Sequence, residues 1–146
     1  MRMILLICFG LISLSFAGTP FTVTEINELY VVVENDTKMV NKKTEILLKK
    51  MMLDKLKSLG VKTDTYAPES FILIIGQNEF GDMKFLNARL MIVSQVKRAK
   101  AKETSLGITY MMDDLFDTTE ANIDMIESLE YMLSEFGDQF IEERDL

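Results

Sequence analysis

A group of acidic residues near the C-terminal third of the chain is the first candidate for chemistry. Asp113, Asp114, Asp117 and Glu120 lie close together in the sequence. Such a group could supply oxygen ligands to a hard cation such as calcium, but it lacks the alternating ligands and central glycine of an EF-hand loop. We therefore expect no metal site. The spacing instead predicts that Asp117 caps a helix, with Glu120 completing a capping box.

Residue types that commonly act as nucleophiles or general bases are scarce. The chain has no histidine, and its single cysteine, Cys8, lies in an apolar N-terminal run. The glycines at 76, 81 and 107 stand alone, so neither a phosphate-binding loop nor a dinucleotide motif is present. We expect neither a cofactor nor enzymatic activity. A carboxylate-based hydrolase remains the alternative, and it requires two acidic residues to converge in a cleft, whereas capping predicts exposed, unpaired Asp113 and Asp117.

A basic cluster follows the longest predicted strand. It contains Lys97, Arg98, Lys100 and Lys102, with no aromatic residues between them. An acidic protein with such a cluster is not expected to bind nucleic acid. The favoured interpretation is a solvated hairpin tip, and peripheral contact with lipid headgroups or an acidic protein is the alternative.

The N-terminal residues resemble a cleavable secretory signal. Arg2 precedes an apolar run from Met3 to Phe16, which ends in Ser15-Phe16-Ala17. We expect a signal peptide over residues 1–17 and a single domain over 18–146, with retention of the signal as an anchor as the alternative. Because the processed chain would contain no cysteine for disulfides, a bacterial periplasm is the expected location. No cysteine follows the apolar run, so no lipid anchor is expected.

Composition predicts one folded core with an uneven charge distribution. Hydrophobic residues make up 48% of the chain and the net charge is −7. Residues 38–62 contain eight lysines and only two acidic residues, Glu45 and Asp54. Residues 113–146 contain twelve acidic residues and only one basic residue, Arg144. The simplest interpretation is two solvated helix surfaces of opposite sign that attract each other. An acidic helix that attracts a basic partner is the alternative.

The first half of the chain predicts a strand, a helix and a second strand. β-Branched and aromatic residues favour a strand over Phe21–Glu34. Asn35-Asp36-Thr37 offers N-cap oxygens for a helix that ends at Gly60. Its apolar stripe comprises Val40, Leu47, Leu48, Met51, Met52, Leu56 and Leu59. The run Phe71–Ile75 predicts a central strand whose apolar side chains cannot all point inward, so the second sheet face is expected to be partly apolar and is a candidate partner surface.

The second half predicts a hairpin meander and a long helix. Gly81-Asp82 forms a turn before a strand over Phe85–Lys100, and a fourth strand runs from Leu106 to about Met112. Leu86, Ala88, Leu90, Ile92 and Val96 predict one dry face of the third strand, and the other face is expected to be largely solvated. The last helix has an apolar stripe at Ile123, Ile126, Leu129, Leu133, Phe136 and Phe140.

These elements predict an α+β fold. Its order is β-α-β-β-β-α, and both amphipathic helices cover one face of a four-stranded mixed sheet in a two-layer sandwich. Over about residues 21 to 143, this order resembles small periplasmic domains of cell-envelope accessory proteins, namely the lipopolysaccharide-assembly lipoprotein and the auxiliary lipoproteins of lipid-transport ABC systems. Those families carry a lipid-bearing cysteine where this chain has Ala17-Gly18. The resemblance rests on element order, so it assigns no functional residue.

The sequence therefore favours a protein that binds another, unidentified envelope protein through the free sheet face or an edge strand. The candidate surface residues are Asn87, Arg89, Gln95, Lys97 and Arg98. A carrier of a small apolar ligand or lipid is the second hypothesis, and it requires a ligand-sized apolar cavity between the helices and the sheet.

Overall fold

The computed structural model describes residue 23, residues 26–97, residue 100 and residues 102–145. The expected signal peptide and Arg98 lie outside the described residues. Seven elements follow one another along the chain. They are β1 (Glu28–Asn35), α1 (Lys42–Ser58), β2 (Lys62–Thr63), β3 (Ser70–Phe80), β4 (Met83–Lys97), β5 (Thr104–Asp117) and α2 (Ala121–Arg144).

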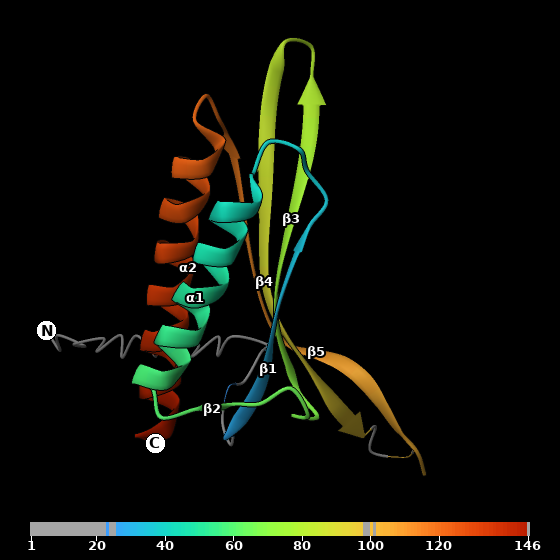
Figure 1. Cartoon of the computed structure of the whole chain (residues 1–146). Coiled ribbons are helices and arrows are strands. Elements are labelled where there is room, and N and C mark those ends of the chain that lie inside the picture. The colour runs from blue at the N-terminus through green and yellow to red at the C-terminus, as the bar shows by residue number, and fades with distance from the viewer. Residues whose placement is uncertain (1–22, 24–25, 98–99, 101, 146) are drawn as a thin grey trace, which may run out of the picture.

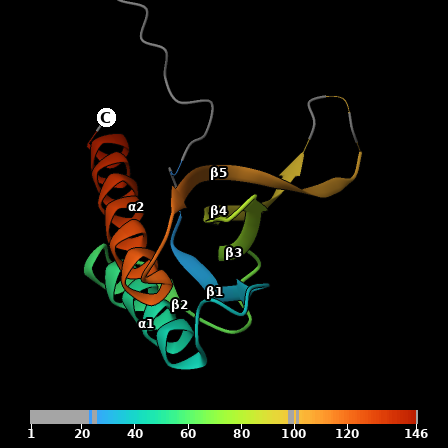
Figure 2. The ribbon, with the colours of Figure 1, turned by 90° about the horizontal axis from the view of Figure 1, so that it is seen from above.

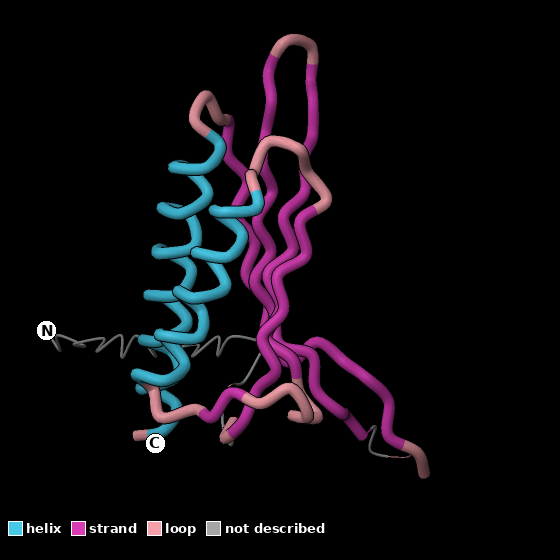
Figure 3. Tube along the Cα trace, viewed as in Figure 1, coloured by secondary structure: helices cyan, strands magenta, loops and turns pink. Residues whose placement is uncertain are grey.

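The strands form one mixed sheet that carries both helices on the same face. The strand order is β2-β1-β3-β4-β5, with β1 parallel to β2 and β3, and with antiparallel pairing of β3 to β4 and β4 to β5. Figure 1 shows α1 and α2 side by side along the sheet, and the secondary-structure colouring of Figure 3 separates the two layers. The predicted α+β sandwich is confirmed, but the sheet has five strands rather than four. The additional strand, β2, has only two residues and no apolar pattern to reveal it.

Helix α1 begins later than the sequence suggested. Its N-cap is Asn41, whose side chain accepts a hydrogen bond from the Thr44 N–H at 2.9 Å. Asn35, in the predicted capping segment, instead accepts the Thr37 N–H and donates to the Val40 carbonyl, so it holds the connection between β1 and α1. The predicted stop is confirmed, because Gly60 adopts a φ of 75° directly after the C-cap.

The meander of β3, β4 and β5 is longer than predicted. The two-residue turn Gly81-Asp82 joins Phe80 to Met83, and Gly81 has the positive φ of 60° that glycine tolerates best. β3 continues five residues beyond the predicted Ile75, where its sequence turns polar but β4 still supplies a hydrogen-bonding partner. A register shift opposite Ile92 and Val93 leaves Thr109 as an extra residue in β5.

The start of α2 also differs from the prediction. Asp117 is the last residue of β5 rather than an N-cap, and Glu120 is the N-cap without a side-chain capping bond. The Asp124 carboxylate takes over this role by accepting hydrogen bonds from the Thr118 hydroxyl and the Glu120 N–H. β5 remains paired with β4 as far as Asp117, which lies opposite Phe85. Asp117 is therefore part of the strand and does not cap the helix.

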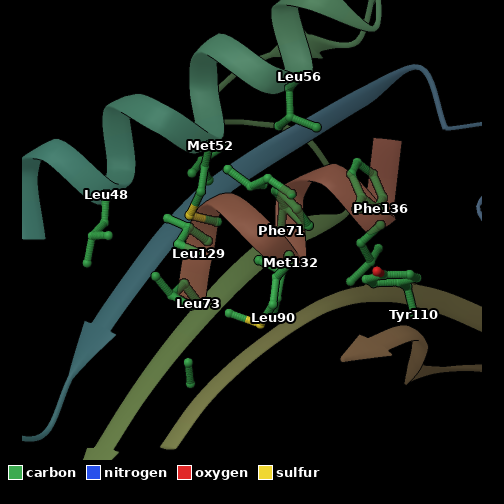
Figure 4. Close-up of a cluster of buried hydrophobic side chains, with 14 of the residues drawn as sticks. Leu48, Met52, Leu56, Phe71, Leu73, Leu90, Tyr110, Leu129, Met132 and Phe136 are labelled. Carbon is green, nitrogen blue, oxygen red and sulfur yellow. The ribbon is translucent and has the colours of Figure 1, made fainter. Parts of the chain in front are cut away.

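The core lies between the two helices and the inner face of the sheet. Phe71 and Phe136 have ring centroids 4.9 Å apart, and Tyr110 meets Phe136 edge-on at 5.2 Å. Figure 4 shows these rings together with methionines and leucines from both layers. Two residues of the predicted stripes are exposed instead, because Leu47 and Ile123 lie on the outward sides of their helices at 42% and 50% exposure. No helix of the described part of the chain is long and apolar enough to cross a membrane.

Candidate functional site

The described elements leave the sheet face opposite the helices uncovered. Figure 2, which views the molecule from above, shows both helices on one side of the curled sheet. Strand residues alternate between the two faces, so every second side chain of β1, β3, β4 and β5 points away from the helices. We call this surface the outer face. Its apolar residues include Tyr30, Val32, Ile72, Ile74, Met91, Val93, Leu106, Ile108, Met111 and Leu115, and Phe80, Met83 and Phe85 lie on the same face near the β3–β4 turn.

Strand register aligns these apolar side chains in rows across the sheet. One row is apolar on all four strands and consists of Val32, Ile72, Met91 and Met111. The next row consists of Tyr30, Ser70, Val93 and Ile108. Leu106 and Leu115 extend the band toward both ends of β5 and are 72% and 63% exposed. The outer face thus carries a continuous apolar band across four strands.

This band corrects the predicted character of the third strand. The inner residues Leu86, Ala88, Leu90 and Ile92 are fully buried as predicted, and Ser94 continues this series at 6% exposure. The opposite side was expected to be largely solvated, but Met91 and Val93 lie there and are only partly exposed. Ile72 and Ile74 also lie on the outer face, so the second face of the central strand is partly apolar as the continuous apolar run of β3 predicted.

The four predicted surface residues that the structure describes lie on the outer face but do not form one cluster. Asn87 and Arg89 are near one end of the apolar band, and Gln95 and Lys97 lie beyond Val93 toward the hairpin tip. The side-chain oxygen of Asn87 is buried and has no hydrogen-bond partner among the described residues. These polar positions therefore border the apolar band rather than form its centre.

Arg89 is held by a carboxylate of the acidic group. Its Nε lies 2.6 Å from Asp113 Oδ1, and its Nη2 lies 3.3 Å from Oδ2, which makes the contact bidentate. The hydrogen bond from Arg89 to Asp113 and the charge of Asp113 raise the pKa of Arg89 above its ordinary value. Arg89 therefore keeps its charge and is paired with a carboxylate, and the two side chains lie in the row of Ile74.

The other acidic residues point in different directions. Because Asp113 and Asp114 are adjacent in a strand, they lie on opposite faces of the sheet. Asp114 accepts a hydrogen bond from the Ser128 hydroxyl of α2 at 2.6 Å. The described residues contain no group of carboxylates arranged to hold a metal ion. The prediction that Asp113 is unpaired is wrong, because it pairs with Arg89, whereas Asp117 is exposed as expected.

The space between the helices and the sheet is filled with side chains. Phe71, Phe136, Met52 and Leu90 are all fully buried there. A hollow of about 240 Å³ between the C-terminal ends of the two helices is below the usual size of a small-molecule site. A larger hollow of about 630 Å³ beside β2 is lined mainly by polar and charged residues such as Glu28, Asp54 and Lys62. This packing disfavours a carrier of apolar ligands between the layers.

Sequence reasoning recognised that the second face of the central strand is partly apolar but missed the extent of the band. The relevant signal was the set of residues at alternate positions in three strands, including Met91, Ile108 and Met111. Their alignment depends on strand register and on the extra residue Thr109, which moves the outward positions of β5 from even to odd numbers.

Comparison with solved structures finds similar chains. The chain is similar in structure to a minor lipoprotein from Acinetobacter baumannii, with 13% identity and a TM-score of 0.29. The similarity covers 79% of this chain and 94% of that chain. No family model matches, and no curated protein matches in sequence. A TM-score this low assigns no function, so the function must be inferred from the site itself.

Proposed function

We propose that this chain is a non-enzymatic, exported protein that binds another protein of the bacterial cell envelope through the outer face. The observation that carries this proposal is the apolar band over four strands, which neither helix covers. Burying such a band against a partner removes apolar surface from water, at about 25 cal/mol for each Å². Burial of the outer face would therefore supply the favourable free energy of association.

The Arg89–Asp113 pair favours a protein over a lipid as the partner. Both side chains are about two-fifths exposed, so both would lose water on binding. Hydrocarbon cannot replace the lost hydrogen bonds, whereas a protein can supply donors and acceptors at its surface. Asp113 also balances the charge of Arg89 at the border of the band, so Arg89 does not present an unpaired charge to an apolar partner surface.

The proposed location rests on the N-terminal sequence. Residues 1–17 have the pattern of a secretory signal, and the absence of cysteine from residues 18–146 is compatible with a protein that folds without disulfides in the periplasm. A protein that binds a partner and catalyses no reaction would suit an assembly or accessory role in the envelope.

Site-specific photocrosslinking in cells tests the proposal. A photoreactive residue at Met91, Ile108 or Gln95 samples the outer face, and the same residue at Glu130 or Ser134 samples the exposed surface of α2. We expect one reproducible crosslinked protein from the outer-face positions and none from the α2 positions. That protein is then purified, and its affinity for the full chain is measured.

Two variants with matched exposure make the affinity measurement specific. Leu115 is 63% exposed on the outer face and Tyr131 is 56% exposed on α2, so lysine at either site leaves the core intact. We expect Leu115→Lys to weaken binding by about tenfold or more, which corresponds to about 1.4 kcal/mol, and Tyr131→Lys to change it by less than about twofold. Equal effects of the two variants, or crosslinking with equal yield from both faces, would overturn the proposal.

A further inference from the structure

The free edge of β5 is a second interaction surface, separate from the outer face. β5 has 14 residues and pairs with β4 on one side only, because it is the last strand of the sheet. Its other side presents backbone N–H and C=O groups with no neighbouring strand in the described part of the chain. Natural edge strands of this length are usually protected by charges, prolines or bulges.

Charge is distributed unevenly along this edge. Residues 104–112 form a stretch of nine residues without a charged side chain or a proline. Lys97, Lys100 and Lys102 precede this stretch and are opposed by Glu103 alone. Asp113, Asp114 and Asp117 follow it. The edge is therefore basic before its uncharged centre and acidic after it.

This polarity suits antiparallel pairing of the strand with itself. In a parallel pair each aspartate would lie beside its own copy, and like charges directly opposite one another are destabilising. In an antiparallel pair the basic start of one strand meets the acidic end of the other, and a two-fold axis creates both contacts at once. We propose that a second copy of this chain pairs with the free edge of β5, which joins the two sheets into one.

The extra residue Thr109 restricts the register of this pair. Outward side chains have even numbers before Thr109 and odd numbers after it. Side chains that oppose each other in a sheet lie on the same face, so an even-numbered residue before the bulge must meet an odd-numbered one after it. An axis through Gly107, with Thr109 left unpaired, satisfies this condition and places Leu106 opposite Ile108 of the other copy. It places Thr104 opposite Met111 and Lys102 opposite Asp113, with no like charges opposed.

A cysteine scan of β5 tests both the pairing and its register. The full chain carrying Cys8→Ser has no other thiol, so an introduced cysteine reports its own position. Leu106→Cys lies directly opposite Ile108→Cys of the other copy, so a mixture of these two variants should form a disulfide-linked dimer under mild oxidation. Thr104→Cys lies about 20 Å from its own copy at 3.3 Å per residue, so it should remain monomeric. A mixture of Thr104→Cys and Met111→Cys should give the mixed dimer.

Charge reversal supplies an independent readout. Lys102→Glu should reduce the yield of the mixed Leu106→Cys and Ile108→Cys dimer several-fold, because the introduced carboxylate would face Asp113 of the other copy. Lys84→Glu is the control, since Lys84 lies at the opposite hairpin and is also exposed. The proposal is overturned if this mixture crosslinks no better than Thr104→Cys alone, or if the chain sediments as a monomer at millimolar concentration. Self-crosslinking of Met91→Cys without crosslinking between Leu106→Cys and Ile108→Cys would indicate a face-to-face dimer and would also overturn it.

Discussion

Tyr110 is the residue at which burial has the clearest chemical consequence. Its side chain is 4% exposed, and its ring packs edge-on against Phe136. Burial raises the pKa of the Tyr110 hydroxyl to about 12, and the nearby charge of Glu135 adds to this effect. The hydroxyl donates only a long contact of 3.9 Å to the Met112 sulfur. The ring therefore contributes far more than the hydroxyl to the stability of the fold at neutral pH.

The raised pKa predicts a loss of stability at high pH. In the unfolded chain the Tyr110 hydroxyl ionises near its ordinary pKa of 10, whereas in the folded chain it stays protonated to about pH 12. The free energy of unfolding should therefore fall as pH rises from about 10 to 12, by up to about 3 kcal/mol from this group. Tyr110→Phe should remove this part of the decrease and cost less than about 1 kcal/mol at pH 7.

Urea unfolding at a series of pH values measures this effect. Tyr66→Phe is the matched control, because the Tyr66 ring is 92% exposed and its removal should leave the pH dependence unchanged. Parallel pH profiles for the wild type and Tyr110→Phe would contradict the assignment of the effect to burial of this hydroxyl.

Residue roles that depend on burial could be predicted from the sequence, whereas roles that depend on pairing could not. Periodicity alone identified Leu129, Leu133 and Phe136 as core residues, and all are buried. The partner of Asp113 follows from the register of β4 with β5, which places Arg89 directly opposite. No local pattern encodes that register, so Asp113 was assigned to a capping or cation-binding group.

At the scale of elements, α1 shows how several capping signals compete. Asn35, Asp36, Thr37 and Asn41 all have side chains suited to an N-cap. The strand pairing of β1 extends to Asn35, and the Asp36 N–H donates to the Ile75 carbonyl, so the chain remains attached to the sheet there. Asn41 lies after the bend at residues 38–40 and directly before the first helical residue, so its side chain caps α1.

This assignment predicts which substitution weakens the helix. Asn41→Ala should lower the free energy of unfolding by about 1 kcal/mol, because the Thr44 N–H loses its acceptor. Asn41→Asp keeps that acceptor and should cost much less. Asp36→Ala should change stability by less than about 0.5 kcal/mol, since its side chain is exposed. Thermal unfolding followed by circular dichroism compares the three variants. A larger loss of stability for Asp36→Ala than for Asn41→Ala would contradict the assignment of Asn41 as the N-cap.

Elements with strong periodicity could be predicted, whereas their ends and the shortest strand could not. Both helices, the central strand and the meander follow from apolar spacing that local residues carry. β2 exists because Lys62 N–H and Asp64 N–H bond to the carbonyls of Asn27 and Leu29 in and beside β1. The bonded residues are more than thirty positions apart in the sequence, and the two residues of β2 have no pattern that would predict a strand.

At the scale of the whole molecule, Phe136 links the helical layer to the sheet. Its ring lies 4.9 Å from Phe71 of β3, 5.2 Å from Tyr110 of β5 and 5.9 Å from Phe140 of α2. Met52 of α1 and Met132 of α2 are also buried in the same core, and the outer face carries no second layer among the described elements. The inner side of the sheet and the helices should therefore unfold as one unit.

Phe136→Ala tests this cooperativity. Removing a fully buried aromatic ring should lower the free energy of unfolding by about 3–5 kcal/mol. Tyr131→Ala on the same helix should cost less than about 0.5 kcal/mol, because Tyr131 is 56% exposed. The chain has no tryptophan, so urea unfolding is followed by far-UV circular dichroism for the helices and by near-UV tyrosine signals for the sheet. If the layers unfold together, both signals shift to lower urea by the same amount in Phe136→Ala. A helical transition that precedes the tyrosine transition would show instead that α2 detaches from a sheet that remains folded without it.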